Sequence, residues 1–162
     1  ASIAKFAAGG KKMAKKDLGQ IIMEYGHVYV ASVAMGANQA QFIKAFKEAE
    51  SYNGPSLIIA YCPCIEQGIK GGLGHMPQVE KDAVDCGYVA LYRYDPRLEK
   101  PLQLDSKEPN WDKFHDFLMS EARYFNLPKL RGQEAAEAAF AKTKHDAQVR
   151  YEKLVKKVND QN

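Results

Sequence analysis

Two cysteines beside a predicted strand are the residues best suited to redox or metal chemistry. Cys62 and Cys64 flank Pro63, directly after the apolar run Ser56–Tyr61. Thiolates are soft ligands that bind iron–sulfur clusters and zinc. An iron–sulfur cluster usually takes four thiolates, and the whole chain has three cysteines. If Cys64 is a cluster ligand, most of the site must lie on polypeptide outside these residues, as in one piece of a larger enzyme.

Other readings of the same residue types remain open at this point. The two thiols could be inert, because unpaired cysteines are among the most buried residue types. A zinc site could use Cys62, Cys64, His75 and Cys86, but their spacing differs from that of the usual structural zinc sites. The Gly68–Gly74 stretch does not follow the phosphate-binding P-loop pattern, so it indicates a flexible connector. No His, acid and nucleophile stand at the spacing of a hydrolytic triad.

The composition is that of an ordinary globular domain. Of the 162 residues, 46% are apolar and 27% are charged, and this length allows one domain with its own core. The net charge of +3 and the lack of a recognition motif argue against a nucleic-acid partner. The longest apolar run, Val28–Ala37, is too short to span a bilayer, which takes about 20 residues. Three cysteines do not indicate a disulfide framework, so we expect a reducing, cytoplasmic setting and no membrane partner.

The elements that would position Cys64 follow a strand–helix–strand order. Residues 28–33 and Ser56–Tyr61 are apolar on both faces, which predicts parallel strands in a covered sheet. Asn38 would begin the helix between them, with Gln41 completing a capping box. An earlier helix would start at Asp17, with Leu18, Ile21, Ile22 and Tyr25 on its buried face, and would end at Gly26.

The second half of the chain predicts more helix than strand. Pro77 would open a helix that Gly87 ends, and residues 89–94 alternate like an edge strand. Trp111, Phe114, Phe117 and Leu118 share one helical face, and a later seam runs from Phe140 to Val158. We therefore expect a helical tail packed on the α/β part or on a neighbouring domain. Residues 1–8 would form a helical turn, and five of the first sixteen residues are lysines, which would form a solvated face or a docking patch.

Six stretches of this sequence strongly resemble the C-terminal end of the pyruvate:ferredoxin (flavodoxin) oxidoreductase family. They are Ile3–Lys11, Lys15–Leu18, Tyr25–Gly36, Lys47–Tyr61, Cys64–Ile65 and Tyr92–Leu98. The resemblance runs in order through about residue 124. Beyond that point the chain is similar to the family only in being helical and charged.

The resemblance implies a fold and a parent enzyme. Residues 1–105 would be the C-terminal half of a thiamine-diphosphate-binding α/β domain with a partial doubly wound parallel sheet, and residues 106–162 a helical C-terminal extension. The parent would be a multidomain, homodimeric, cytoplasmic oxidoreductase that decarboxylates pyruvate with coenzyme A to acetyl-CoA and carbon dioxide. Thiamine diphosphate, held with Mg²⁺, would stabilise the carbanion that forms. Electrons would leave through 4Fe–4S clusters to ferredoxin or flavodoxin.

The resemblance implies one site residue in this chain, Cys64. In the family, three ligands of the cluster nearest the thiamine come from upstream domains, and the fourth comes from the loop that follows the strand corresponding to Ser56–Tyr61. Cys64 falls on that fourth position, whereas Glu66 stands where the family has asparagine. The motifs that hold the diphosphate and Mg²⁺ lie before Ala1 in the family, so we expect this chain alone to be inactive. Two alternative functions stay open: the same chemistry on another 2-oxoacid, or a non-catalytic docking module.

Overall fold

A four-stranded mixed sheet forms the centre of the computed structural model, which describes residues 16–64 and 68–161. The strands are β1 (Tyr29–Val33), β2 (Ser56–Ala60), β3 (Tyr92–Tyr94) and β4 (Leu102–Leu104), and the strand order is β2-β1-β3-β4. β1 and β2 are parallel, while β3 runs antiparallel to both β1 and β4. The α/β class and the parallel strand pair are confirmed.

The third strand lies inside the sheet rather than at its edge. β3 pairs with β1 on one side and with β4 on the other, so the prediction of an edge strand at residues 89–94 was wrong. The sequence analysis missed β4 because three residues are too few to establish a two-residue alternation. These two short strands make the sheet mixed instead of wholly parallel.

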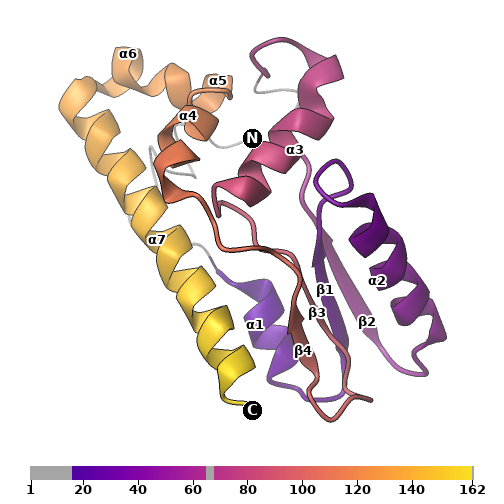
Figure 1. The fold of residues 1–162 in the computed structure, drawn as a ribbon. Coiled ribbons are helices and arrows are strands. Elements are labelled where there is room, and N and C mark those ends of the chain that lie inside the picture. Colours follow the sequence, from indigo (N-terminus) through magenta and orange to yellow (C-terminus); the bar gives the residue numbers. More distant parts are fainter. Residues whose placement is uncertain (1–15, 65–67, 162) are drawn as a thin grey trace.

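Helices cover both faces of the sheet, and Figure 1 shows α1 and α2 on opposite sides of it. Along β1, successive side chains point to opposite faces. Val30 packs with the α1 residue Met23, whereas Ala31 and Val33 pack with Ala45 of α2. Every residue of β1 is buried as a result.

Helix α1 (Leu18–Met23) starts where the sequence predicts but buries a different face. The Asp17 side chain accepts a hydrogen bond from the backbone N–H of Gln20 at 3.1 Å. Gly19 and Met23 are the buried residues, because Gly19 lies directly against the Tyr92 hydroxyl. Three residues of the expected apolar face are exposed, namely Leu18, Ile21 and Tyr25.

Helix α2 (Gln39–Ser51) connects the two parallel strands. The Asn38 side chain accepts from the backbone N–H of Gln41 at 3.0 Å, as expected of an N-cap. The Gln41 side chain does not complete a capping box. Its Nε2 donates instead to the carbonyl of Ser32 at 3.2 Å and to Asp105 at 3.0 Å. The start of α2 is thereby tied to the sheet.

A buried ion network joins α2 to the sheet around Arg93 of β3, which is 6% exposed. Its Nη1 donates to both carboxylate oxygens of Glu48 at 2.7 and 2.9 Å. Its Nε and Nη2 donate to Asp105, both at 2.9 Å. The Tyr29 hydroxyl also donates to Glu48 at 2.9 Å. These hydrogen bonds, those to Asp105 above all, raise the pKa of Arg93 above its usual value.

The second half of the chain is largely helical, as expected. Helix α3 (Met76–Asp85) follows a short 3₁₀ turn, η2 (Leu73–His75), and has Pro77 in its first turn. The later elements are η3 (Trp111–Lys113), α4 (Phe114–Leu118), α5 (Ala122–Phe125), α6 (Leu127–Arg131) and α7 (Gln133–Asn159). The predicted helical face from Trp111 to Leu118 packs in the same apolar cluster as the α3 residue Ala83.

Helix α7 runs along one side of the molecule, from the small helices to the sheet (Figure 1). Its 27 residues span about 40 Å at 1.5 Å per residue. Phe140 packs with α3 and α4, and Leu154 packs against the sheet. Just beyond the helix, the Gln161 side chain accepts from the N–H of Leu102 at 2.7 Å and donates to its carbonyl at 3.0 Å. The predicted packing of the tail on the α/β part is confirmed.

Candidate functional site

Cys64 follows the carboxyl end of β2 by four residues. The backbone N–H of Tyr61 donates to the carbonyl of Val33 at 2.9 Å, which extends the β1–β2 pairing by one residue. Cys64 follows three residues later and is half-buried, whereas Cys62 is exposed. Ligand sites of open α/β sheets lie outside the carboxyl ends of parallel strands. The thiol of Cys64 therefore stands at the end of the sheet where such a site is expected.

Shortly after Cys64, residues 68–70 pair with the segment between α4 and α5. Ile69 forms an isolated antiparallel bridge with Glu121. The N–H of Lys70 donates to Ser120 at 2.9 Å, and the N–H of Ala122 donates to Gly68 at 3.1 Å. Residues 65–67, and with them the predicted departure at Glu66, lie outside the described residues.

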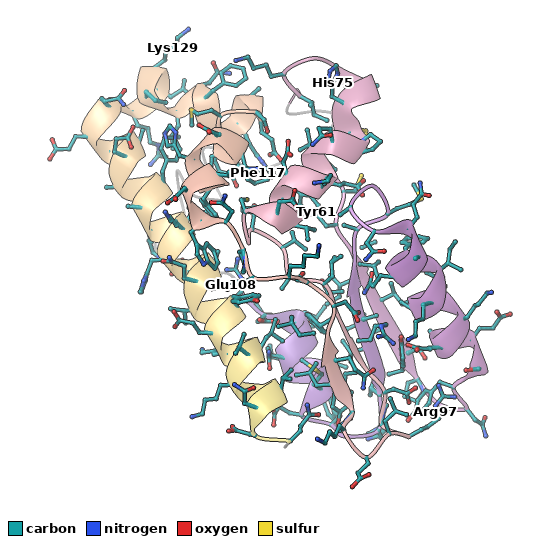
Figure 2. The ribbon with its side chains drawn as sticks, in the orientation of Figure 1. Tyr61, His75, Arg97, Glu108, Phe117 and Lys129 are labelled. Atoms are coloured by element: carbon teal, nitrogen blue, oxygen red, sulfur yellow. The ribbon has the colours of Figure 1, made fainter. Side chains whose placement is uncertain are left out.

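A buried carboxylate connects the two sides of this segment. Glu121 is 1% exposed, and the Tyr61 hydroxyl donates to its Oε1 at 3.1 Å. Its other oxygen pairs with Nε of Arg123. Burial raises the pKa of Tyr61 well above its usual value, so the phenol stays protonated and donates. Tyr61 and Phe117, both labelled in Figure 2, belong to one apolar cluster that includes residues of α3, α4 and α7.

The end of β1 is fixed against α3 by a close backbone contact. A Cβ placed on Gly36 would lie 2.5 Å from the Cα of Pro77, so no larger residue fits without movement of the backbone. The N–H of Gly36 donates to the buried carboxylate of Glu80 at 2.7 Å. The first turn of α3 is thereby held at the same end of the sheet as Cys64.

The structure does not bring together the four residues of the zinc site that the sequence allowed. Within residues 16–64 and 68–161, no three His, Cys, Asp or Glu side chains are grouped so as to hold a metal ion. The set Cys62, Cys64, His75 and Cys86 is therefore not a metal site. Cys86 is fully buried in the core, and burial raises the pKa of its thiol to about 11. A thiol with that pKa is protonated at neutral pH and is not a ready metal ligand.

Sequence reasoning did not single out Glu121 or Arg123. The residue types of a buried ion pair are the same as those of an exposed one, and neither residue belongs to a motif of defined spacing. A possible signal was the bulk of Tyr61 at the end of an apolar strand, because a buried tyrosine hydroxyl needs a partner. That signal does not say which residue supplies the acceptor.

The lysine-rich start of the chain lies almost wholly outside the described residues. Of the five lysines near the start, Lys16 is described and is exposed, and the other four lie outside the described residues, as does the helical turn predicted for residues 1–8. Among the helices that the structure describes, none has the length and apolar character needed to cross a lipid bilayer.

Comparisons with known proteins match the chain to a segment of much longer enzymes. No family model matches the chain. The chain is 52% identical over 159 residues to a pyruvate:ferredoxin oxidoreductase of Moorella thermoacetica, and 48% identical over 155 residues to a pyruvate-flavodoxin oxidoreductase of Klebsiella pneumoniae. These matches cover 96% and 93% of the chain but 13% of each enzyme. A mitochondrial pyruvate dehydrogenase (NADP+) of Euglena gracilis is 51% identical over 133 residues, which is 80% of the chain and 7% of that protein.

The extent of these matches corrects one expectation. A match over 96% of the chain includes most of the helical tail, whereas the sequence resemblance was expected to end at about residue 124. The family resemblance itself is confirmed, because several relatives at about half identity carry that name. The chain is a homologue of one segment, 13% of the length, of the pyruvate:ferredoxin and pyruvate-flavodoxin oxidoreductases.

Proposed function

We propose that this chain is the C-terminal part of the thiamine-diphosphate-binding domain of a pyruvate:ferredoxin (flavodoxin) oxidoreductase. The parent enzyme converts pyruvate and coenzyme A into acetyl-CoA, carbon dioxide and a proton, and passes two electrons singly to ferredoxin or flavodoxin. The observation that carries the proposal is the identity of about one half, over nearly the whole chain, to enzymes named for that reaction. In this assignment residues 1–105 belong to the α/β domain and residues 106–162 form its helical extension.

Cys64 is the residue of this chain that we assign to metal binding, as one ligand of a 4Fe–4S cluster. Two features support this assignment. The residue is half-buried after the carboxyl end of the parallel strands, and the chain is hydrogen-bonded at Tyr61 before it and at Gly68 and Lys70 after it. A bound cluster would supply one-electron transfer.

The residues around Cys64 have two tasks in this proposal, which are to hold the thiolate in place and to limit its contact with water. The strand pairing at Tyr61 fixes the backbone on one side, and the bridge at Ile69 fixes it on the other. Partial burial of a ligand sulfur and its hydrogen bonds tune the potential of a cluster. Thiamine diphosphate and Mg²⁺ are assigned to upstream domains of the parent protein, and so are the other three cysteines.

Substitution of the two neighbouring cysteines in the parent protein tests the assignment. Cys64→Ala should remove the iron and the electron paramagnetic resonance signal of one cluster, together with pyruvate-dependent reduction of ferredoxin. Cys62→Ala is the matched control, because Cys62 is exposed and two residues away, and it should keep all three. A Cys64→Ala protein with full iron content and electron transfer would show that the ligand assignment is wrong.

The substrate is tested separately. The names of the relatives favour pyruvate over other 2-oxoacids. Turnover of pyruvate should therefore exceed that of 2-oxoglutarate in the parent protein at equal concentration. The reverse order would point to the same chemistry on another 2-oxoacid.

A further inference from the structure

We propose that Glu121 is a positioning residue for Cys64, which holds both sides of the Cys64 segment against the helical extension. The inference rests on the proposed function, because it assigns the contact a role in placing a cluster ligand. Glu121 does not act on the ligand directly. It acts through the backbone that precedes Cys64 and the backbone that follows it.

The incoming side of the segment is held through Tyr61, three residues before Cys64. Its backbone N–H belongs to the sheet, since it donates to Val33. Its hydroxyl donates to Oε1 of Glu121 at 3.1 Å, and its ring packs edge-on against Tyr88 with centroids 5.9 Å apart. Tyr61, the residue directly after β2, is therefore held by its backbone N–H on one side and by its side chain on the other.

The outgoing side is held by the backbone around the same glutamate. Ile69 pairs with Glu121 in an antiparallel bridge, and the hydrogen bonds of Gly68 and Lys70 to residues 122 and 120 close that bridge on either side. Residues 120–122 thus contact the chain on both sides of Cys64, at Tyr61 before it and at residues 68–70 after it.

The buried charge of Glu121 requires both of its partners to stay in place. Glu121 is 1% exposed, so its carboxylate depends on the hydrogen bond from Tyr61 and the ion pair with Arg123. The guanidinium of Arg123 is in turn stacked over the Tyr124 ring, 5.0 Å from its centroid. A buried charge that loses one partner is strongly unfavourable. The arrangement therefore favours one position of the Tyr61 ring relative to α5.

This precision matters for a ligand that completes a site built on other polypeptide. Metal ligands work within about 0.5 Å of the productive position, and supporting contacts provide that accuracy. When three thiolates are held by upstream domains, the fourth has to be placed independently of them. The helical extension supplies that placement through Glu121, in addition to packing on the sheet.

Conservative variants of the parent protein test the inference. Tyr61→Phe removes the hydroxyl and keeps the ring, and Glu121→Gln keeps an acceptor for Tyr61 but loses the charge. Tyr29→Phe is the matched control, because it removes a hydroxyl that donates to the carboxylate of Glu48 at 2.9 Å, at the opposite end of the parallel strand pair from Cys64. Each protein is measured for the rate of iron loss to a chelator, and for the spectrum and midpoint potential of the cluster that Cys64→Ala removes.

We expect Tyr61→Phe and Glu121→Gln to accelerate iron loss about tenfold or more, and to shift the spectrum and potential of that cluster. Tyr29→Phe should match the wild type in all three. The inference is overturned if the two variants behave as the wild type, or if Tyr29→Phe changes the cluster equally. A Cys64→Ala protein that keeps the cluster overturns the ligand assignment itself, and this outcome is distinct from an intact assignment with silent Glu121 variants.

Discussion

The substitution Arg93→Met tests how strongly the buried ion network ties α2 to the sheet. Arg93 makes four hydrogen bonds of 2.7–2.9 Å to the carboxylates of Glu48 and Asp105. Those side chains are 22% and 16% exposed, respectively. Methionine preserves much of the apolar stem but leaves two partly buried carboxylates without their guanidinium partner, and Glu48 keeps as a cation only the exposed Lys44, 3.9 Å away.

The expected loss is about 3–5 kcal/mol in the free energy of unfolding, the range for removing one partner of a buried ion pair. Four charge-assisted hydrogen bonds at about 1.5–3 kcal/mol each would sum to more. We expect the smaller loss because both carboxylates reach some solvent and keep other donors, Tyr29 for Glu48 and Gln41 for Asp105. A loss of this size is a large share of the about 5–15 kcal/mol of a typical domain.

Urea unfolding of the chain, followed by circular dichroism, measures the effect as a lower midpoint with an unchanged slope. Lys81→Met is the control, because its ion pair with Asp85 is exposed and should contribute about 0.5 kcal/mol or less. The triple variant Arg93→Met, Glu48→Gln, Asp105→Asn should be more stable than Arg93→Met alone, since it removes the orphaned charges. A cost below about 1 kcal/mol for Arg93→Met, or a triple variant that is no more stable, would refute this reasoning.

Three other changes test the fold around the site. Gly36→Ala places a Cβ 2.5 Å from the Pro77 Cα and should cost about 1–3 kcal/mol by urea unfolding; an unchanged midpoint would contradict the close contact. Phe140→Ala empties a buried position between α7 and the small helices and should cost about 3–5 kcal/mol; a loss below about 1 kcal/mol would place Phe140 outside the core. The hydrogen bonds from Arg97 lower the pKa of Asp95, so their stabilisation is present above the ordinary aspartate pKa of about 3.9 and is lost as the pH falls through the lowered pKa of the folded state. The stability gap between wild type and Asp95→Asn should therefore be constant near pH 7 and shrink below about pH 4; a gap that widens on acidification would reverse the sign.

The elements with strong local signals were predictable from the sequence. The strand at Tyr29–Val33 is apolar on both faces, and Asn38 and Pro77 mark helix starts through their own chemistry. Phe140 and Leu154 gave the helical period of α7, and both are buried as that period requires. In these segments the local preference and the tertiary environment agree, which is why pattern alone was sufficient.

The remaining features depend on contacts between distant residues. Strand β4 exists because it pairs with β3, and α1 buries Gly19 because Tyr92 lies against it. Neither partner can be read from local spacing. The same holds for Glu121, whose partner is a tyrosine sixty positions earlier in the chain. Cys64 was predicted as a ligand from family resemblance, since a single thiol carries no motif.

The attachment of Gln161 to Leu102 has a consequence for the solubility of the folded chain. An outer strand with open N–H and C=O groups is a template for the strand of another molecule, and such pairing leads to aggregation. On β4, the Gln161 amide occupies both backbone groups of Leu102, and α7 packs beside the same strand. At Leu102, a side-chain amide thus takes the hydrogen bonds that a neighbouring strand would make. This protects β4 from edge-to-edge growth into larger assemblies.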